Sequence, residues 1–176
     1  MKRISQQISR DASSPHQDFL TAMTTIQIRK ALIDDIPRIV FLLQNGRPND
    51  ERSDLSLEQD LDQLLKAFER IDSNENAFLM VAEIKGLVVG TFQLNYLTYL
   101  VGKGAEDAQI EAVHVDASFR GRGIGTQMIN WVIEHAKSRK CRRIQLMTDK
   151  RRTRAHRFYE RLGFSPSHEG MKLQLT

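Results

Sequence analysis

Three glycines stand at alternate positions in the segment Arg120-Gly121-Arg122-Gly123-Ile124-Gly125. Residues 109–115 before it read as a strand, and the residues after it carry apolar side chains at helical spacing. A strand that turns into a helix gathers unpaired backbone N–H groups at the positive end of the helix dipole. Glycine lets that main chain approach an oxyanion and adopt positive φ. The segment therefore predicts a phosphate-binding site, the alternative being glycines that serve tight packing only.

The type of phosphate ligand is narrowed by what the segment lacks. It has no Gly-Lys-Ser/Thr ending, which a nucleoside triphosphate loop requires, and its spacing differs from the dinucleotide fingerprint. Between residues 137 and 161, eleven Lys or Arg residues face only two acidic ones, which suits an anionic ligand or simply a solvated surface. Nucleic acid is disfavoured, because Phe158 and Tyr159 are the only aromatic residues within that run.

Two segments resemble motifs of one enzyme family. Residues 115–125, Val-Asp-Ala-Ser-Phe-Arg-Gly-Arg-Gly-Ile-Gly, resemble motif A of the GNAT acetyltransferases. Residues 158–164, Phe-Tyr-Glu-Arg-Leu-Gly-Phe, resemble motif B, in the expected order and separated by a helix and a strand. The resemblance covers residues 24–176 and implies an acetyl-CoA-dependent N-acetyltransferase acting directly on a primary amine.

The resemblance also implies which residues bind acetyl-CoA. The pyrophosphate would be held by backbone amides of Arg120, Gly121, Arg122, Gly123, Ile124 and Gly125. The pantetheine arm would pair with main-chain groups of Ala112, Val113, His114 and Val115. One position departs from the family: many members have Asn three residues before the motif-B alanine, whereas this chain has Arg152 before Ala155.

Two side chains are the candidates for proton transfer. Tyr159 matches the motif-B tyrosine that the family uses as general acid toward the leaving thiolate, and its alternative role is packing on the sheet. Glu111 could deprotonate an ammonium acceptor through water, and its alternative is a partly exposed strand residue. By alternation along a strand, Glu111 faces away from Ile110, Ala112 and the rival base His114.

The acceptor is predicted from charge. Acidic residues outnumber Arg47 and Arg52 in the stretch 45–62, where the resembling family builds part of its acceptor wall; they are Asp50, Glu51, Asp54, Glu58, Asp60 and Asp62. If Asp50, Glu51 or Asp54 lines the pocket, a cationic amine is favoured over an anionic one. The alternative is that these acids face water near the start of a helix.

The elements that must position these residues follow from periodicity. Strands are expected at 25–29, 77–84, 87–99, 109–115, 143–147 and 171–175, with a hairpin turn at Lys85-Gly86. Helices are expected from about 36 to Gly46, from Ser56 to Ile71, from 124 to 136 and from 153 to 162. The resemblance implies an α/β (α+β) fold: a mixed, mostly antiparallel sheet of about seven strands, about four helices, and a splay between strands four and five.

Length and composition set the remaining expectations. A chain of 176 residues with 40% hydrophobic and 27% charged residues suits one domain at 24–176, with residues 1–23 as a disordered extension. No secretory signal or membrane helix is recognisable, so we expect a cytoplasmic protein. A single cysteine, Cys141, excludes an internal disulfide and a multi-cysteine zinc site, and we expect no metal. The expected partner is a small-molecule amine, and the sequence leaves open whether the protein forms a homodimer. Two rival functions remain: an acyl-CoA-binding regulator without turnover, and a basic nucleic-acid-binding module.

Overall fold

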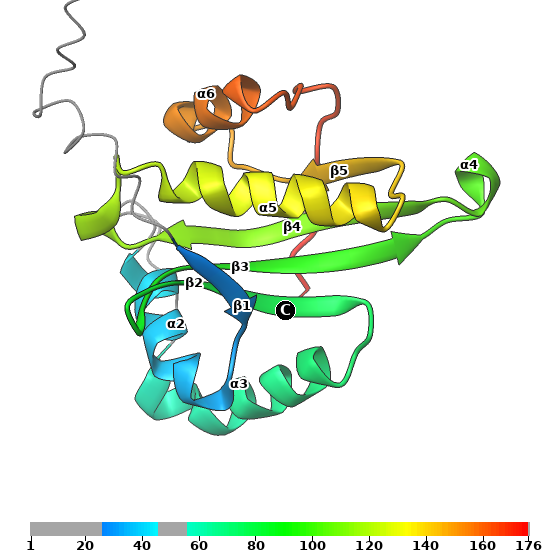
Figure 1. The fold of residues 1–176 in the computed structure, drawn as a ribbon. Helices are drawn as coiled ribbons and strands as arrows, with labels where there is room; N and C mark the ends of the chain where they lie inside the picture. Colours follow the sequence, from blue (N-terminus) through cyan, green and yellow to red (C-terminus); the bar gives the residue numbers. More distant parts are fainter. Residues whose placement is uncertain (1–25, 46–55, 176) are drawn as a thin grey trace, which may run out of the picture.

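The structure, a computed structural model, describes residues 26–45 and 56–175. It contains one open sheet with the strand order β1-β2-β3-β4-β5 (Figure 1). The strands are β1 (Gln27–Lys30), β2 (Ala77–Ile84), β3 (Leu87–Thr98), β4 (Glu106–Val115) and β5 (Arg143–Leu146). Neighbours from β1 to β4 run antiparallel, and β4 and β5 run parallel. The predicted mixed, mostly antiparallel sheet is therefore confirmed.

Helices cover both faces of this sheet. They are α2 (Ile36–Asn45), α3 (Leu57–Asp72), the short α4 (Val101–Gly104), α5 (Ile124–Ser138) and α6 (Thr153–Arg161). The larger core cluster lies between α5 and the inner strands, and its members include Phe92, Leu94, Ile110, Met128 and Val132. A second cluster lies under α2 and α3 on the opposite face. None of the described helices is long and apolar enough to cross a membrane.

Local sequence signals account for several element boundaries. Lys85 and Gly86 have φ values of 48° and 82°, as both central residues of a tight hairpin turn require, and the predicted β2–β3 hairpin is confirmed. Ser56 caps α3 by accepting from the amide of Gln59 at 3.3 Å. The reciprocal bond of this cap comes from Asp60, whose carboxylate accepts from the amide of Ser56 at 2.8 Å.

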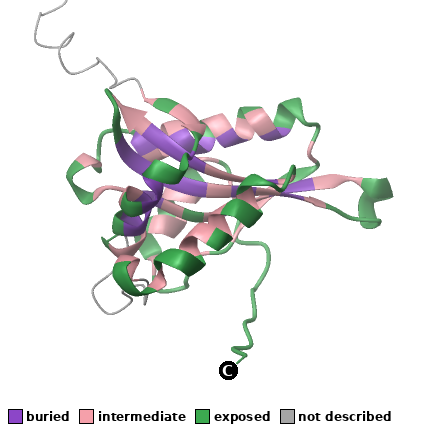
Figure 2. Ribbon diagram, turned by 90° about the horizontal axis from the view of Figure 1, so that it is seen from below, coloured by how far each residue is buried: buried purple, intermediate pink, exposed green. Residues whose placement is uncertain are grey.

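The prediction of a last strand at residues 171–175 is wrong, and the sheet has five strands instead of about seven. Met171, Leu173 and Leu175 alternate as a half-buried strand would, yet they are 94%, 85% and 89% exposed (Figure 2). Strand structure requires a neighbour that shares backbone hydrogen bonds, and among the described residues β5 pairs only with β4. Alternation of residue types alone therefore did not correctly predict a strand here, because it does not supply a pairing partner.

Two sets of predictions lie outside the described residues. The extension at 1–23 is one of them. The acidic residues Asp50, Glu51 and Asp54 of the expected acceptor wall are the other.

The strand β4 is irregular just beyond the end of its ladder with β5. Gln93 pairs with Glu111 and Thr91 with His114, so Ala112 and Val113 together lie opposite Phe92 as a β-bulge. Ala112 has φ 51°, which an L-residue inside a strand seldom adopts. The β4–β5 ladder ends at the pair Ile110–Leu146, whereas β4 continues to Val115. The splay predicted between the fourth and fifth strands would begin at this end of the ladder, and it stays a prediction.

Candidate active site

The glycine segment forms a turn of open backbone at the start of α5. Gly121 and Gly123 have φ values of 77° and 75°, and an added Cβ would meet no atom within 4 Å at either position. Their role is therefore backbone conformation, not packing. No side chain caps α5, and the amide of Gln127 donates to Gly123 O at 3.0 Å. The amides of the first turn before Gln127 have no acceptor four residues back in the helix, so they are available to an anion.

Gly125 has a different role from the two glycines before it. A Cβ at Gly125 would stand 3.3 Å from Cζ of Phe158, so glycine here lets α6 pack against the first turn of α5. The sequence prediction grouped all three glycines as phosphate ligands by backbone. The structure adds that Gly125 also lets motif A and motif B pack against each other.

The loop before the glycines is fixed from the opposite side of the sheet. Asp116 accepts from the amide of Ser118 at 2.8 Å and forms an ion pair with Arg38 of α2. Arg38 also donates to Val88 O at 2.9 Å. The hydroxyl of Ser118 is the main reason why the pKa of the Asp116 carboxyl lies below its usual value, and Arg38 lowers it further. Sequence reasoning missed this anchor, because Arg38 and Asp116 are far apart in the chain.

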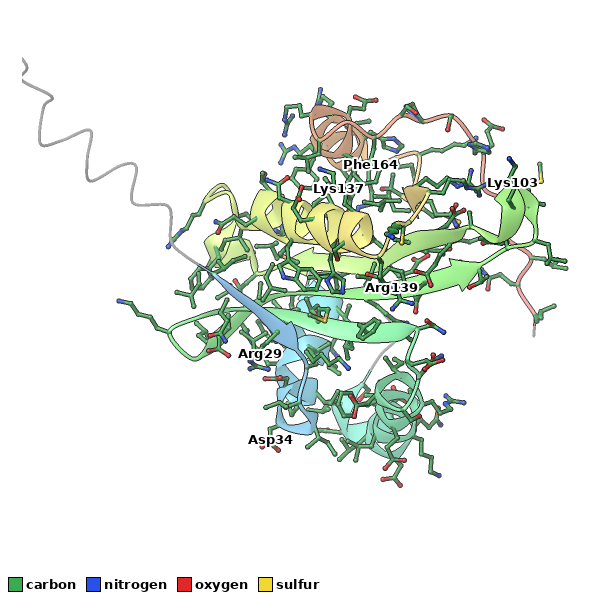
Figure 3. The ribbon with its side chains drawn as sticks, turned by 45° about the vertical axis from the view of Figure 1, so that its right-hand side comes forward. Arg29, Asp34, Lys103, Lys137, Arg139 and Phe164 are labelled. Atoms are coloured by element: carbon green, nitrogen blue, oxygen red, sulfur yellow. The ribbon has the colours of Figure 1, made fainter. Side chains whose placement is uncertain are left out.

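Tyr159 lies on α6, half-buried against the core under α5. Its ring makes edge contacts with Phe158 at 5.1 Å and Phe164 at 5.7 Å between centroids, and Figure 3 shows Phe164 beside α6. Burial raises the pKa of the Tyr159 hydroxyl, the charge of Arg152 lowers it, and the charge of Glu111 raises it. A phenol that keeps its proton at neutral pH suits a general acid. Arg152, at the position where the family often has Asn, thus lies near the candidate acid.

Glu111 is the last β4 residue before the bulge, and it is half-buried. Its Oε1 accepts from Nε2 of Gln109 at 2.6 Å. Gln109 in turn accepts from Nε2 of Gln145 on β5 at 3.2 Å. Two amide groups in series therefore hold the carboxylate beside the opening between β4 and β5. The charge of this carboxylate reaches the Tyr159 hydroxyl, whose pKa it raises.

The bulge overturns the predicted face of His114. Ile110 lies in the core under α5, and Val113 and Val115 also pack against that core, so the alternation is reset between them. His114 consequently lies opposite Thr91 on the other face, the same face as Glu111. It is 6% exposed. Ala112, at the bulge itself, is exposed.

Part of the basic run lies far from the glycine turn. Arg139 follows the last turn of α5 (Figure 3). At the usual helical rise it lies about 20 Å from the start of that helix. It binds Glu106 through Nε at 2.7 Å. Arg142 and Arg143 both bind Asp107, at 2.8 and 2.9 Å. Arg139 and Arg142, two cations of the basic run, therefore hold carboxylates of β4 in this structure.

A row of polar side chains on β3, β4 and β5 surrounds Glu111, and its other members were not singled out from the sequence. Gln93, Asn95, Gln109, Glu111 and Gln145 are half-buried on the face opposite α5. A signal for them existed: Gln93 and Asn95, like Gln109 and Glu111, stand two apart and alternate with core residues. Among the described residues, no group of three His, Cys, Asp or Glu side chains is arranged to hold a metal ion.

Comparison with known proteins agrees with the motifs. The family model described as "Acetyltransferase (GNAT) family" matches residues 40–164. The chain is 40% identical over 93 residues to an uncharacterised N-acetyltransferase of Methanocaldococcus jannaschii, which covers 52% of this chain and 40% of the relative. It is 32% identical over 90 residues to the glucosamine 6-phosphate N-acetyltransferase of Trypanosoma brucei brucei, covering 51% of this chain and 59% of that one. The chain thus spans about half the length of these curated relatives.

The fold is also found among solved structures. The crystal structure of a transcriptional regulator from Bacillus halodurans C-125 superposes with a TM-score of 0.80. The two sequences are 38% identical, and the alignment covers 86% of this chain and 100% of that one.

Proposed function

The chain belongs to the GNAT acetyltransferase family, and from this premise we propose that it transfers an acetyl group from acetyl-CoA directly to the amine of a small molecule. The observation that carries the proposal is the pairing of the open glycine turn with Tyr159 and Glu111 at the end of the β4–β5 ladder. A cytoplasmic location and residues 24–176 as the working domain remain part of the proposal.

The described residues fit acetyl-CoA. Gly121 and Gly123 leave the backbone of the turn open, and the uncapped first turn of α5 offers amides to a pyrophosphate. Arg120, Arg122 and Ile124 would add their amides on either side of the glycines. Beyond Ile110, β4 has main-chain groups without a β5 partner from Ala112 to Val115, and these would pair with the pantetheine arm.

The roles of the protein side chains follow from the chemistry. Acetyl-CoA supplies the acetyl group: a C–N bond forms, the C–S bond breaks, the amine gives up one proton, and the leaving sulfur takes one. Glu111 would accept the amine proton, directly or through water, and Gln109 would keep the carboxylate in place. Tyr159 would supply the proton for the sulfur, since a phenol is protonated at neutral pH and burial raises the pKa of this one further.

A small amine is the acceptor that the relatives support. The trypanosomal relative is named for glucosamine 6-phosphate, an amine that carries a phosphate. The preference for a cationic amine, which rests on Asp50, Glu51 and Asp54, remains a prediction from the sequence.

A second candidate is an acyl-CoA-binding regulator without turnover. It is favoured by the Bacillus halodurans protein, which is named a transcriptional regulator and resembles this chain over most of its length. A single experiment separates the two: release of free thiol from acetyl-CoA, measured across a panel of primary amines, alongside the thermal shift that acetyl-CoA causes. Thiol release that depends on an amine supports the enzyme. A thermal shift without any amine-dependent thiol release supports the regulator.

A further inference from the structure

The two faces of the β3–β5 part of the sheet differ in composition. Under α5 the strands form an apolar core, whose members include Phe92, Leu94, Ala108 and Ile110. The opposite face is apolar where it packs under α2 and α3, through Val81 and Val88. Farther along β3 and across β4 and β5, that same face carries the carboxamide row: Gln93, Asn95, Gln109 and Gln145, with Glu111 among them.

The carboxamide row is an organised set of groups. Nε2 of Gln93 donates to Oδ1 of Asn95 at 2.9 Å, and the Gln145–Gln109–Glu111 series runs beside this pair. Among the described residues, Oε1 of Gln93, Nδ2 of Asn95 and Oε1 of Gln145 have no hydrogen-bond partner. The row thus has two hydrogen-bond acceptors and one donor that a ligand could bind.

The row lies where the acceptor must lie if the proposed function holds. Tyr159 comes from α6, on the α5 face, and Glu111 points to the other face, where Gln93 and Gln109 are its neighbours. An amine that gives its proton to Glu111 therefore approaches across the row. Three neighbouring strands span about 10 Å, and two side chains on the same face of one strand are about 7 Å apart. The row is therefore about the size of a single small ring.

The chemistry of the row selects neutral polar groups. Carboxamides both donate and accept hydrogen bonds, as hydroxyl groups do, and they neither attract nor repel a net charge. Arg142 and Arg143, the nearest cations along β5, are both bound to Asp107. A bare alkyl amine would leave the row's free groups without partners, which costs binding energy once water is displaced.

We propose, on the basis of the acetyltransferase function above, that the carboxamide row is the acceptor-recognition surface and that it selects an amine bearing several hydroxyl groups, such as an amino sugar or amino polyol. Gln93 and Asn95 are the specificity-determining residues, because they belong to the row and make no hydrogen bond with Glu111. Gln109 and Gln145 position Glu111 as well as line the row.

Two amines of equal ring size test this. Glucosamine carries hydroxyl groups and cyclohexylamine carries none, so kcat/KM is measured for both by thiol release with saturating acetyl-CoA. The expected ratio in favour of glucosamine is at least ~10, the worth of one or two hydrogen bonds. Gln93→Leu and Asn95→Leu should each lower kcat/KM for glucosamine about tenfold and change that for cyclohexylamine less than about twofold.

Controls separate the outcomes. Gln63→Leu, an exposed glutamine on α3, should change neither ratio nor rate. The thermal shift with acetyl-CoA should be the same in all variants, which shows that they are folded and bind the cofactor. Equal losses for both amines in Gln93→Leu, or a wild-type preference for cyclohexylamine, would overturn the acceptor inference while the acetyltransferase stands. No thiol release with any amine would overturn the proposed function and this inference together.

Discussion

Between Asp107 and Ile110, β4 has a strand on each side, whereas from Glu111 to Val115 it is paired with β3 only. Glu106, just before the closed half, and Asp107 within it are held by arginines, and the side chain of Asp107 is fully buried. In the open half, the carboxylate of Glu111 is held by a neutral amide, and the backbone bends at Ala112. The same strand therefore places its strong ionic contacts in one half and its unpaired backbone and reactive groups in the other.

This difference shows how one element can serve stability and function. The closed half fixes the register of β4 against β5, so the opening always begins after the pair Ile110–Leu146. The open half retains backbone groups that only a ligand would satisfy. Substitutions in the open half should therefore lower binding or turnover with little loss of stability. Substitutions in the closed half should lower stability with little loss of binding or turnover.

The largest expected effect is at the glycine turn. Gly125→Asp places a carboxylate among the amides of the first turn of α5 and within reach of Phe158, so the thermal shift caused by acetyl-CoA should disappear. Gly86→Asp, at a hairpin turn remote from the site, is the control for loss of a glycine. An undiminished shift in a folded Gly125→Asp protein would show that the cradle lies elsewhere.

Tyr159→Phe removes one hydroxyl and keeps the ring packing. We expect kcat to fall by about 10²-fold or more, with the affinity for acetyl-CoA unchanged, because general acid catalysis is typically worth ~10²–10⁴-fold. The unfolding midpoint measures the cost to stability, which should be small. A kcat within about twofold of wild type would leave Tyr159 a packing residue.

Glu111→Gln should lower kcat/KM by about 10²-fold, the low end of general base catalysis. The rising limb of the kcat/KM profile should also move to higher pH, since the amine must then lose its proton unaided. Gln109→Leu, which removes the bond at 2.6 Å, should lower kcat in the same direction by a smaller factor. A profile that stays in place would assign the base to His114 or to water.

The smallest effect on catalysis is expected from the closed half. Asp107→Asn should leave kcat within about threefold and destabilise the fold by about 2 kcal/mol, because Asp107 is buried while both arginines are partly exposed. Hydrogen bonding from Arg142 lowers the pKa of Asp107 below its usual 3.8. The wild type should therefore lose this stability as pH falls from about 3.8, where the unfolded carboxyl takes up its proton, toward the lower pKa of the folded carboxyl, and the variant should not. Urea unfolding at pH 7 and pH 3 measures both.

Much of the fold follows from local signals in the sequence. The hairpin at Lys85-Gly86, the cap at Ser56 and the apolar stripe of α5 require only residues within one or two turns of each other. The family motifs located the glycine turn and the α6 tyrosine for the same reason. The strand expected at 171–175 failed, because its pattern is local and its partner is not.

The sequence by itself determined which residue types are available to the site: glycines able to adopt positive φ, an acidic strand residue and a tyrosine in a recognisable motif. Only the tertiary structure decided which of them meet. The bulge at Ala112, which sets the face of His114, depends on how β4 registers against β3. The carboxamide row exists because three strands lie side by side, and Arg139 and Arg142 bind carboxylates more than thirty residues away in the chain. Such pairings arise when the chain packs, because contact energies depend on distance in space and not on separation along the sequence.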